Sequence, residues 1–205
     1  MSPSSASGSG TRYVWSLTLR DLLVLVFAAD LVVLGKGLLR VPIHVPGHSG
    51  LLIVCLFVLA RGLVDKNGAA TIMGLVAGFL ATVFGYGHDG LLEWTKYASM
   101  GIALDATTFL VGGRLTNFGV AFVVGALANL AKLGSMILVG VILGLPLTFL
   151  ALGLGIAAVS HAVFGALGGL LAAFLLRQLR RIPYFARSTR VDSSGPPGEA
   201  RGGPA

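Results

Sequence analysis

Residues 118–179 read FGVAFVVGALANLAKLGSMILVGVILGLPLTFLALGLGIAAVSHAVFGALGGLLAAFLLRQL, and this stretch decides the fold class. It is almost continuously apolar, with Asn129, Lys132 and His161 as the conspicuous polar side chains inside it. A helix rises 1.5 Å per residue, so about 60 residues are too many for one crossing of a hydrocarbon core about 30 Å thick. We therefore predict two membrane-spanning helices separated at Gly144-Leu145-Pro146, because glycine and proline interrupt helices.

The composition of the chain agrees with this interpretation. Of the 205 residues, 55% are hydrophobic and 11% are charged, and the mean hydropathy is +0.89. Soluble domains average about 25% charged residues. Soluble enzymes, nucleic-acid-binding modules and secreted disulfide scaffolds are therefore excluded, and the single cysteine, Cys55, excludes an intrachain disulfide and a CxxC motif.

Four more apolar segments precede this stretch, over residues 17–39, 51–64, 69–86 and 91–112. The second has only about 14 residues, a length that also fits a re-entrant segment, and we interpret it as a short span. Gly74 and Gly78 form a G-x-x-x-G pair that lets another helix approach closely. The predicted fold class is an all-α integral membrane protein with six transmembrane helices.

The distribution of basic residues decides the topology. Breaks at Lys132-Leu133-Gly134 and near Val159 would instead give seven spans and place the arginine-rich tail outside, against the positive-inside rule. Six spans with both termini cytoplasmic place eleven of the fifteen basic residues inside: Arg12, Arg20, Arg61, Lys66, Arg114, Arg177, Arg180, Arg181, Arg187, Arg190 and Arg201. We therefore expect a multi-pass protein of the plasma (inner) membrane.

The chain divides into three parts. Residues 1–11 are rich in serine and glycine, and we expect them to be disordered. They lack the features of a signal peptide, so we expect the first apolar segment to remain in the mature protein as a span. Residues 12–181 form the predicted transmembrane domain. Residues 182–205 read as a disordered basic tail.

Several polar residues fall in the proposed outer half of the membrane or in the outer loops, where an ionisable group is costly and indicates function. Asn129 and Lys132 are three residues apart and share a helix face, as do Glu93 and Lys96. The lysines Lys36, Lys96 and Lys132 suit a carboxylate or phosphate, or they pair with Asp30, Glu93 and Asp89. The candidate substrate-binding residues are His44, His48, His88, Asp89, Trp94, Tyr97, Asn129, Lys132 and His161.

Two other kinds of site are open to these residues. His44, His48 and His88 with Asp89 could hold nickel, cobalt or zinc, although nearby lysines would repel a cation. Gly47-His48-Ser49-Gly50 matches the serine motif of rhomboid-type intramembrane proteases, and a dyad would need Ser49 within hydrogen-bond reach of His161. Ser49 follows only one span, whereas that family's serine begins its fourth core helix. We therefore expect no enzyme, and we interpret Ser49 as a cap on the helix that starts at Leu51.

The region from Leu17 to Arg181 resembles the substrate-binding S component of energy-coupling factor (ECF) transporters. The resemblance lies in the loop with Pro42, Pro46 and Gly47, in residues 61–70 (RGLVDKNGAA) and in Asp105 near the end of the fourth segment. Residues 61–70, with Gly74 and Gly78 after them, are similar to the family's L-G-P-x-x-G-A…G pattern without its proline.

The resemblance implies capture of a vitamin, precursor or metal from outside, followed by toppling in the membrane to release it. A transmembrane coupling protein and two cytoplasmic ATPases would drive this. The sequence has no Walker P-loop, so ATP would be used by the partners alone, with no intrinsic cofactor. His44 and His48 would form the lid. A nickel or cobalt uptake subunit and a non-transport membrane scaffold are the alternatives.

Overall fold

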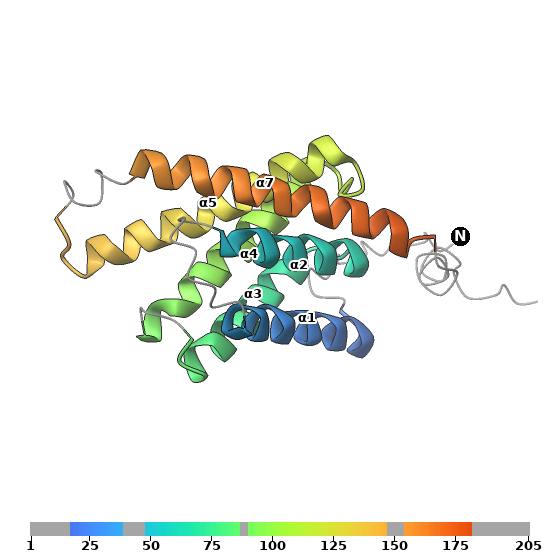
Figure 1. Cartoon of the computed structure of the whole chain (residues 1–205). Helices are drawn as coiled ribbons and strands as arrows, with labels where there is room; N and C mark the ends of the chain where they lie inside the picture. The colour runs from blue at the N-terminus through green and yellow to red at the C-terminus, as the bar shows by residue number, and fades with distance from the viewer. Residues whose placement is uncertain (1–16, 39–47, 87–89, 147–153, 182–205) are drawn as a thin grey trace, which may run out of the picture.

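The computed structural model describes residues 17–38, 48–86, 90–146 and 154–181, and within them it contains six α-helices and no β-strand (Figure 1). Each expected segment before residue 118 corresponds to one α-helix, although α2 begins two residues earlier than expected, and residues 118–179 divide into two helices, as predicted. The all-helical fold class is therefore confirmed. The helices are α1 (Leu19–Leu38), α2 (Ser49–Val64), α3 (Ala69–Val83), α4 (Glu93–Leu110), α5 (Phe118–Ile142) and α7 (Leu154–Leu179), with a short 3₁₀ helix η1 (Gly90–Leu92) before α4.

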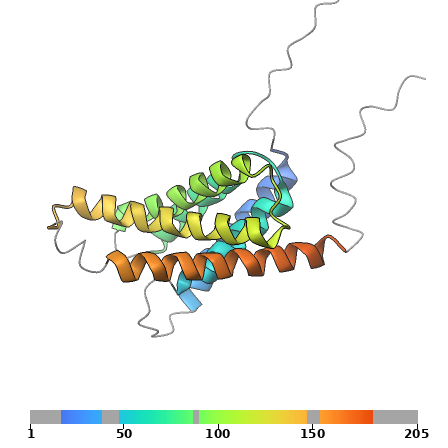
Figure 2. The same ribbon diagram turned by 90° about the horizontal axis from the view of Figure 1, so that it is seen from above.

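The six helices pack in a closed ring whose order differs from the chain order. Going round the ring, the neighbours are α1, α3, α4, α5, α7 and α2, and α2 contacts α1 again. Figures 1 and 2 both show α5 and α7 side by side along most of their length. Because α2 lies between α1 and α7, it joins the first and the last helix of the chain in one bundle.

Glycines allow the closest helix contacts. Gly74 and Gly78 of α3 lie against the backbone of Tyr97 and Trp94 of α4, where an added Cβ atom would collide. The predicted close approach at the G-x-x-x-G pair is therefore confirmed. The α5–α7 contact is built in the same way, because Gly125 faces the Gly165 carbonyl and Gly169 faces the Ala121 carbonyl.

The break in residues 118–179 has a clear local cause. Gly144 adopts a left-handed backbone with φ of 77°, and its N–H donates to the Val141 carbonyl at 3.0 Å. The Leu145 N–H donates to the Gly140 carbonyl at 3.0 Å, which completes a Schellman motif. The carbonyls of Gly140 and Val141 near the end of α5 are thus satisfied, and the helix ends where glycine and proline predict.

The distribution of side chains between interior and surface is typical of a protein in lipid. Large apolar side chains face outward, including Phe27, Phe79 and Ile156, whereas seven polar or charged residues are buried among those that the structure describes. Helices α5 and α7 are long and apolar enough to cross a membrane by length and composition. Such a surface would be unstable in water but suits a hydrocarbon solvent, and these features support a membrane protein.

Candidate functional site

The described residues contain two polar clusters in the bundle interior, at its opposite ends. The first, here called the lysine cluster, lies where α1 ends and α2 and α4 begin. It comprises Lys36, Glu93, Lys96, Tyr97, Asn129, Lys132 and His161. The second, the arginine cluster, lies where α2 ends and α3 begins. It comprises Arg61, Asn67, Thr71 and Asp105.

A glutamate shared by two lysines organises the lysine cluster. Glu93 is only 1% exposed, and its Oε1 lies 2.6 Å from the Lys36 ammonium. Its Oε2 lies 2.9 Å from the Lys96 ammonium. Lys36 also lies 5.6 Å from the centroid of the Tyr97 ring, within cation–π range. Both carboxylate oxygens are therefore occupied by lysines from two different helices.

A third lysine approaches this group from α5. Lys132 is 9% exposed and lies within electrostatic range of Lys36, Lys96 and Glu93. No described side chain forms an ion pair or hydrogen bond with its ammonium group. Lys132 also lies within electrostatic range of His161 of α7. A buried ammonium without a counter-ion is costly, and it favours an anion nearby.

Asn129 connects the cluster to α2 and α7. Its Nδ2 donates a hydrogen bond of 2.8 Å to the His161 carbonyl, and its side chain packs against the backbone of Gly50. A carbonyl needs a donor, so this bond fixes the orientation of the amide and leaves Oδ1 as the atom without a partner.

Three buried polar atoms of the cluster lack a hydrogen-bond partner among the described residues: the Tyr97 hydroxyl, Asn129 Oδ1 and His161 Nδ1. Leaving such an atom unpaired costs about 1–3 kcal/mol. Together they provide donors and an acceptor beside the lysines, within an otherwise apolar bundle. This arrangement can bind a small polar molecule, which would satisfy atoms that the protein leaves unpaired.

Local helix physics positions the charged groups. Glu93 lies in the first turn of α4 and Lys36 in the last turn of α1, where the helix dipoles favour a negative and a positive charge respectively. Residues 93, 96 and 97 share the buried face of α4, and Asn129 and Lys132 share that of α5. The predicted facial pairing is confirmed at both places.

The structure brings together four of the nine candidate residues: Tyr97, Asn129, Lys132 and His161. Trp94 is 45% exposed and stays outside the buried cluster, and His48 occupies the N-cap position of α2. The other three, His44, His88 and Asp89, lie outside the described residues. The predicted metal set depends on them, and among the described residues no group of three or more potential ligands occurs.

Lys36 and Glu93 are central to the cluster, although neither was among the candidate binding residues. The alternative that a lysine pairs with Glu93 is confirmed for Lys36 and Lys96. The signal available was the spacing of Glu93 and Lys96 at one helix end, together with a lysine in the last turn of another span. The pairing of a lysine with Asp30, which the sequence left open, is wrong for Lys36, because Lys36 pairs with Glu93 instead. Within the described residues Asp30 forms no ion pair or hydrogen bond with Lys36, Lys96 or Lys132.

The protease-like motif does not form a dyad in this structure. Ser49 begins α2, and no described residue hydrogen-bonds to the Nδ1 of His161. The interpretation of Ser49 as a cap is wrong, because the helix starts at Ser49 itself and His48 precedes it without a capping side-chain bond.

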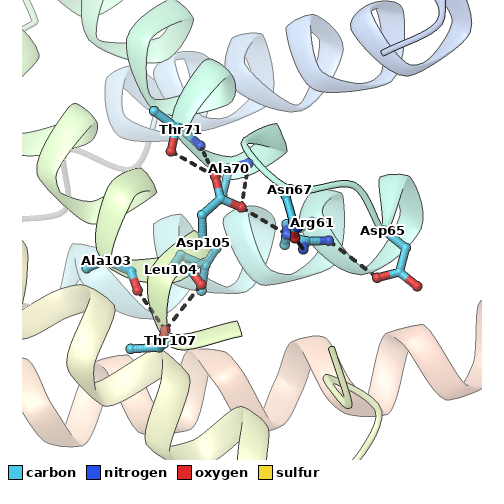
Figure 3. A network of polar contacts seen from close by, with 9 residues as sticks. All are labelled: Arg61, Asp65, Asn67, Ala70, Thr71, Ala103, Leu104, Asp105 and Thr107. Carbon is cyan, nitrogen blue, oxygen red and sulfur yellow. Dashed lines mark hydrogen bonds and ion pairs between the residues drawn. The ribbon is translucent and has the colours of Figure 1, made fainter. Parts of the chain in front are cut away.

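The arginine cluster has a structural character, because its charges are satisfied (Figure 3). Asp105 accepts a bond of 2.9 Å from Arg61 Nε, and it also accepts from the backbone N–H and the hydroxyl of Thr71 at 2.7 and 2.8 Å. Arg61 bonds Asn67 as well, at 3.3 Å. Asp105 thereby joins α4 to α2 and caps the N-terminus of α3, where the helix dipole favours a carboxylate.

A hollow of about 480 Å³ lies away from both clusters, on an outward face of α7. Its lining is largely apolar, so it suits lipid chains better than a polar solute. The lining residues are Gly155, Ile156, Val159, Ser160, Val163 and Phe164.

Comparison with known proteins bears on the fold. No protein-family model matches the sequence, and no curated protein matches it. Among solved structures, the chain is similar to a crystal structure of an S component of an ECF transporter, with a TM-score of 0.60 and 15% sequence identity. The similarity covers 88% of this chain and all of the other. The resemblance seen in the sequence is thus confirmed for the architecture: this chain has the fold of an ECF transporter S component.

Proposed function

We propose that the protein is the substrate-capturing subunit of an ECF-type, ATP-driven importer, and that it binds a small vitamin-like or precursor solute in the lysine cluster. The observation that carries the proposal is the set of unpaired atoms of Tyr97, Asn129 and His161 beside three lysines. A protein that only anchors or organises others has no need for such atoms, each of which costs stability. The shared fold supports a transport role.

Six membrane spans with cytoplasmic termini would place the lysine cluster toward the outer face. The arginine cluster and the basic residues Arg114, Arg177 and Arg180 would then lie toward the cytoplasm, in agreement with the positive-inside rule. His44 and His48 would lie on the outer side as a lid, with His88 and Asp89 in the second outer loop. Release inward would require a transmembrane coupling protein and two cytoplasmic ATPases. Only these partners would use ATP.

Native mass spectrometry of the full chain, purified in a mild detergent, tests the proposal. We expect a small-molecule adduct at a one-to-one ratio in the unmodified protein. The adduct should be lost or strongly reduced in Lys132→Met. It should persist in Lys66→Met, because Lys66 pairs with Asp21 at 2.9 Å near the opposite end of the bundle.

Failure to retain or bind any small molecule, in the protein alone or titrated with extracts of its host cell, would count against capture and favour a scaffold. An adduct that both lysine variants keep equally would move the binding site away from the lysine cluster. Elemental analysis of the same samples decides whether the adduct is a metal ion, as the alternative of nickel or cobalt uptake requires.

A further inference from the structure

The charge of the lysine cluster restricts the chemistry of its ligand. Glu93 is the one acid that the structure describes in contact with the cluster's lysines, and Lys36 and Lys96 occupy its two oxygens. Lys132 is more than nine-tenths buried, lies among these charges and forms no ion pair with a described residue. A cationic solute or a divalent metal placed there would be repelled by three ammonium groups.

The unpaired atoms of the lysine cluster indicate how an anion would be held. The Tyr97 hydroxyl is a donor, and a neutral His161 can donate from Nδ1. Asn129 Oδ1 is an acceptor, because its Nδ2 already donates to the His161 carbonyl. The cluster therefore provides a cation and two donors for an anionic group, and one acceptor for an N–H or O–H elsewhere on the same molecule.

We infer that the solute carries a carboxylate or phosphate group, and that the ammonium of Lys132 binds this group between Tyr97 and His161. This inference rests on the proposed function and narrows it. Glu93 does not oppose anion binding, because its charge is neutralised by the two lysines that it holds. Glu93 holds Lys36 and Lys96 in place. The charge that remains without an ion pair among the described residues is the positive charge of Lys132.

Thermal unfolding of the full chain in detergent, at constant ionic strength, tests the inference with named probes. The anions are inorganic phosphate, benzoate and phenyl phosphate, and the neutral partners of the last two are benzamide and phenol. We expect a saturable rise in the unfolding midpoint with the anions but not with the neutral partners. Charge-assisted hydrogen bonds predict affinity about 10- to 100-fold weaker in Lys132→Met.

Two further variants distinguish loss of the site from loss of the fold. Lys132→Arg keeps the positive charge and should keep the preference for anions, whereas Lys132→Gln should lose it. Lys66→Met removes a lysine near the opposite end and should respond as the unmodified protein does. Equal stabilisation by acids and their neutral partners, or an unchanged response in Lys132→Met and Lys132→Gln, would overturn the inference.

The molecule released from the purified protein separates this inference from the proposed function. A water-soluble anion that Lys132→Met no longer retains supports both. A neutral or cationic solute lost in the same variant keeps the capture function but overturns the anion assignment. Release of an anionic phospholipid, identified by its mass, supports an anion site at Lys132 but contradicts solute capture.

Discussion

Glu93 is the acid that balances the charge of two lysines in the lysine cluster. It is nearly fully buried and accepts hydrogen bonds from Lys36 and Lys96 at 2.6 and 2.9 Å. Glu93→Gln would leave two ammonium groups beside a neutral amide. Removing one member of a buried ion pair costs about 3–5 kcal/mol. We expect a clearly lower thermal midpoint in detergent, measured by differential scanning fluorimetry.

Lys66→Met is the matched control for this prediction. It breaks a lysine–carboxylate pair of similar length, 2.9 Å, but both side chains are partly exposed. Partly exposed pairs contribute up to about 1 kcal/mol. Similar losses in the two variants would contradict the view that burial makes Glu93 the critical acid.

Asp105 is expected to matter for stability and not for binding. Asp105→Ala removes the closer carboxylate of the buried Arg61 and the acceptor for the first turn of α3, while Arg61 keeps its longer contact of 3.4 Å with Asp65. We expect a loss of about 3 kcal/mol in unfolding free energy, because the buried guanidinium loses its closest carboxylate. Solute affinity, measured by isothermal titration on the folded protein, should stay within about threefold. A large loss of affinity with unchanged stability would show that the arginine cluster takes part in binding.

The contact between α5 and α7 depends on glycine at specific positions. A Cβ at Gly169 would collide with the Ala121 carbonyl, whereas one at Gly134, also within a helix, meets open space. Gly169→Ala should therefore cost about 1–3 kcal/mol through overpacking. Gly134→Ala should be neutral or slightly stabilising. Thermal midpoints of the two variants check this, and equal midpoints would contradict the close α5–α7 packing.

The helices could be predicted from the sequence because their signals are local. Apolar run length, the glycine and proline at residues 144 and 146, and three-residue spacings such as Asn129 to Lys132 each depend on a single segment. The ring order could not be predicted, because it depends on how side chains pack between segments. Lys36 lies 57 residues before Glu93, so no local pattern reveals their pairing.

The same reason limits prediction of the site. Tyr97, Asn129, Lys132 and His161 were identifiable, because a polar group in an apolar span is unusual wherever the span packs. Trp94 was expected to line the site because aromatic residues suit planar ligands, yet it is largely outward-facing on α4. Successive residues of a helix point in directions about 100° apart, so a residue next to a buried one can face outward. The sequence alone did not show which residues in the first turn of α4 face inward.

The bundle has a polar cluster inside each of its two ends and an apolar exterior. Its proposed orientation in the membrane is testable. In a Cys55→Ala background, Leu145→Cys follows α5 and Arg181→Cys follows α7, and both positions are exposed. An impermeant maleimide added to intact cells should label position 145 alone, and position 181 should react only after permeabilisation. The reverse pattern would place the lysine cluster on the cytoplasmic side.

The central claim is that the lysine cluster binds the solute, and an experimental structure of the solute-loaded protein tests it most directly. We predict density for one small molecule in contact with the Lys132 ammonium and within hydrogen-bond distance of Tyr97 or His161. Density in the hollow on α7 or beside Arg61, with none at Lys132, would contradict the account.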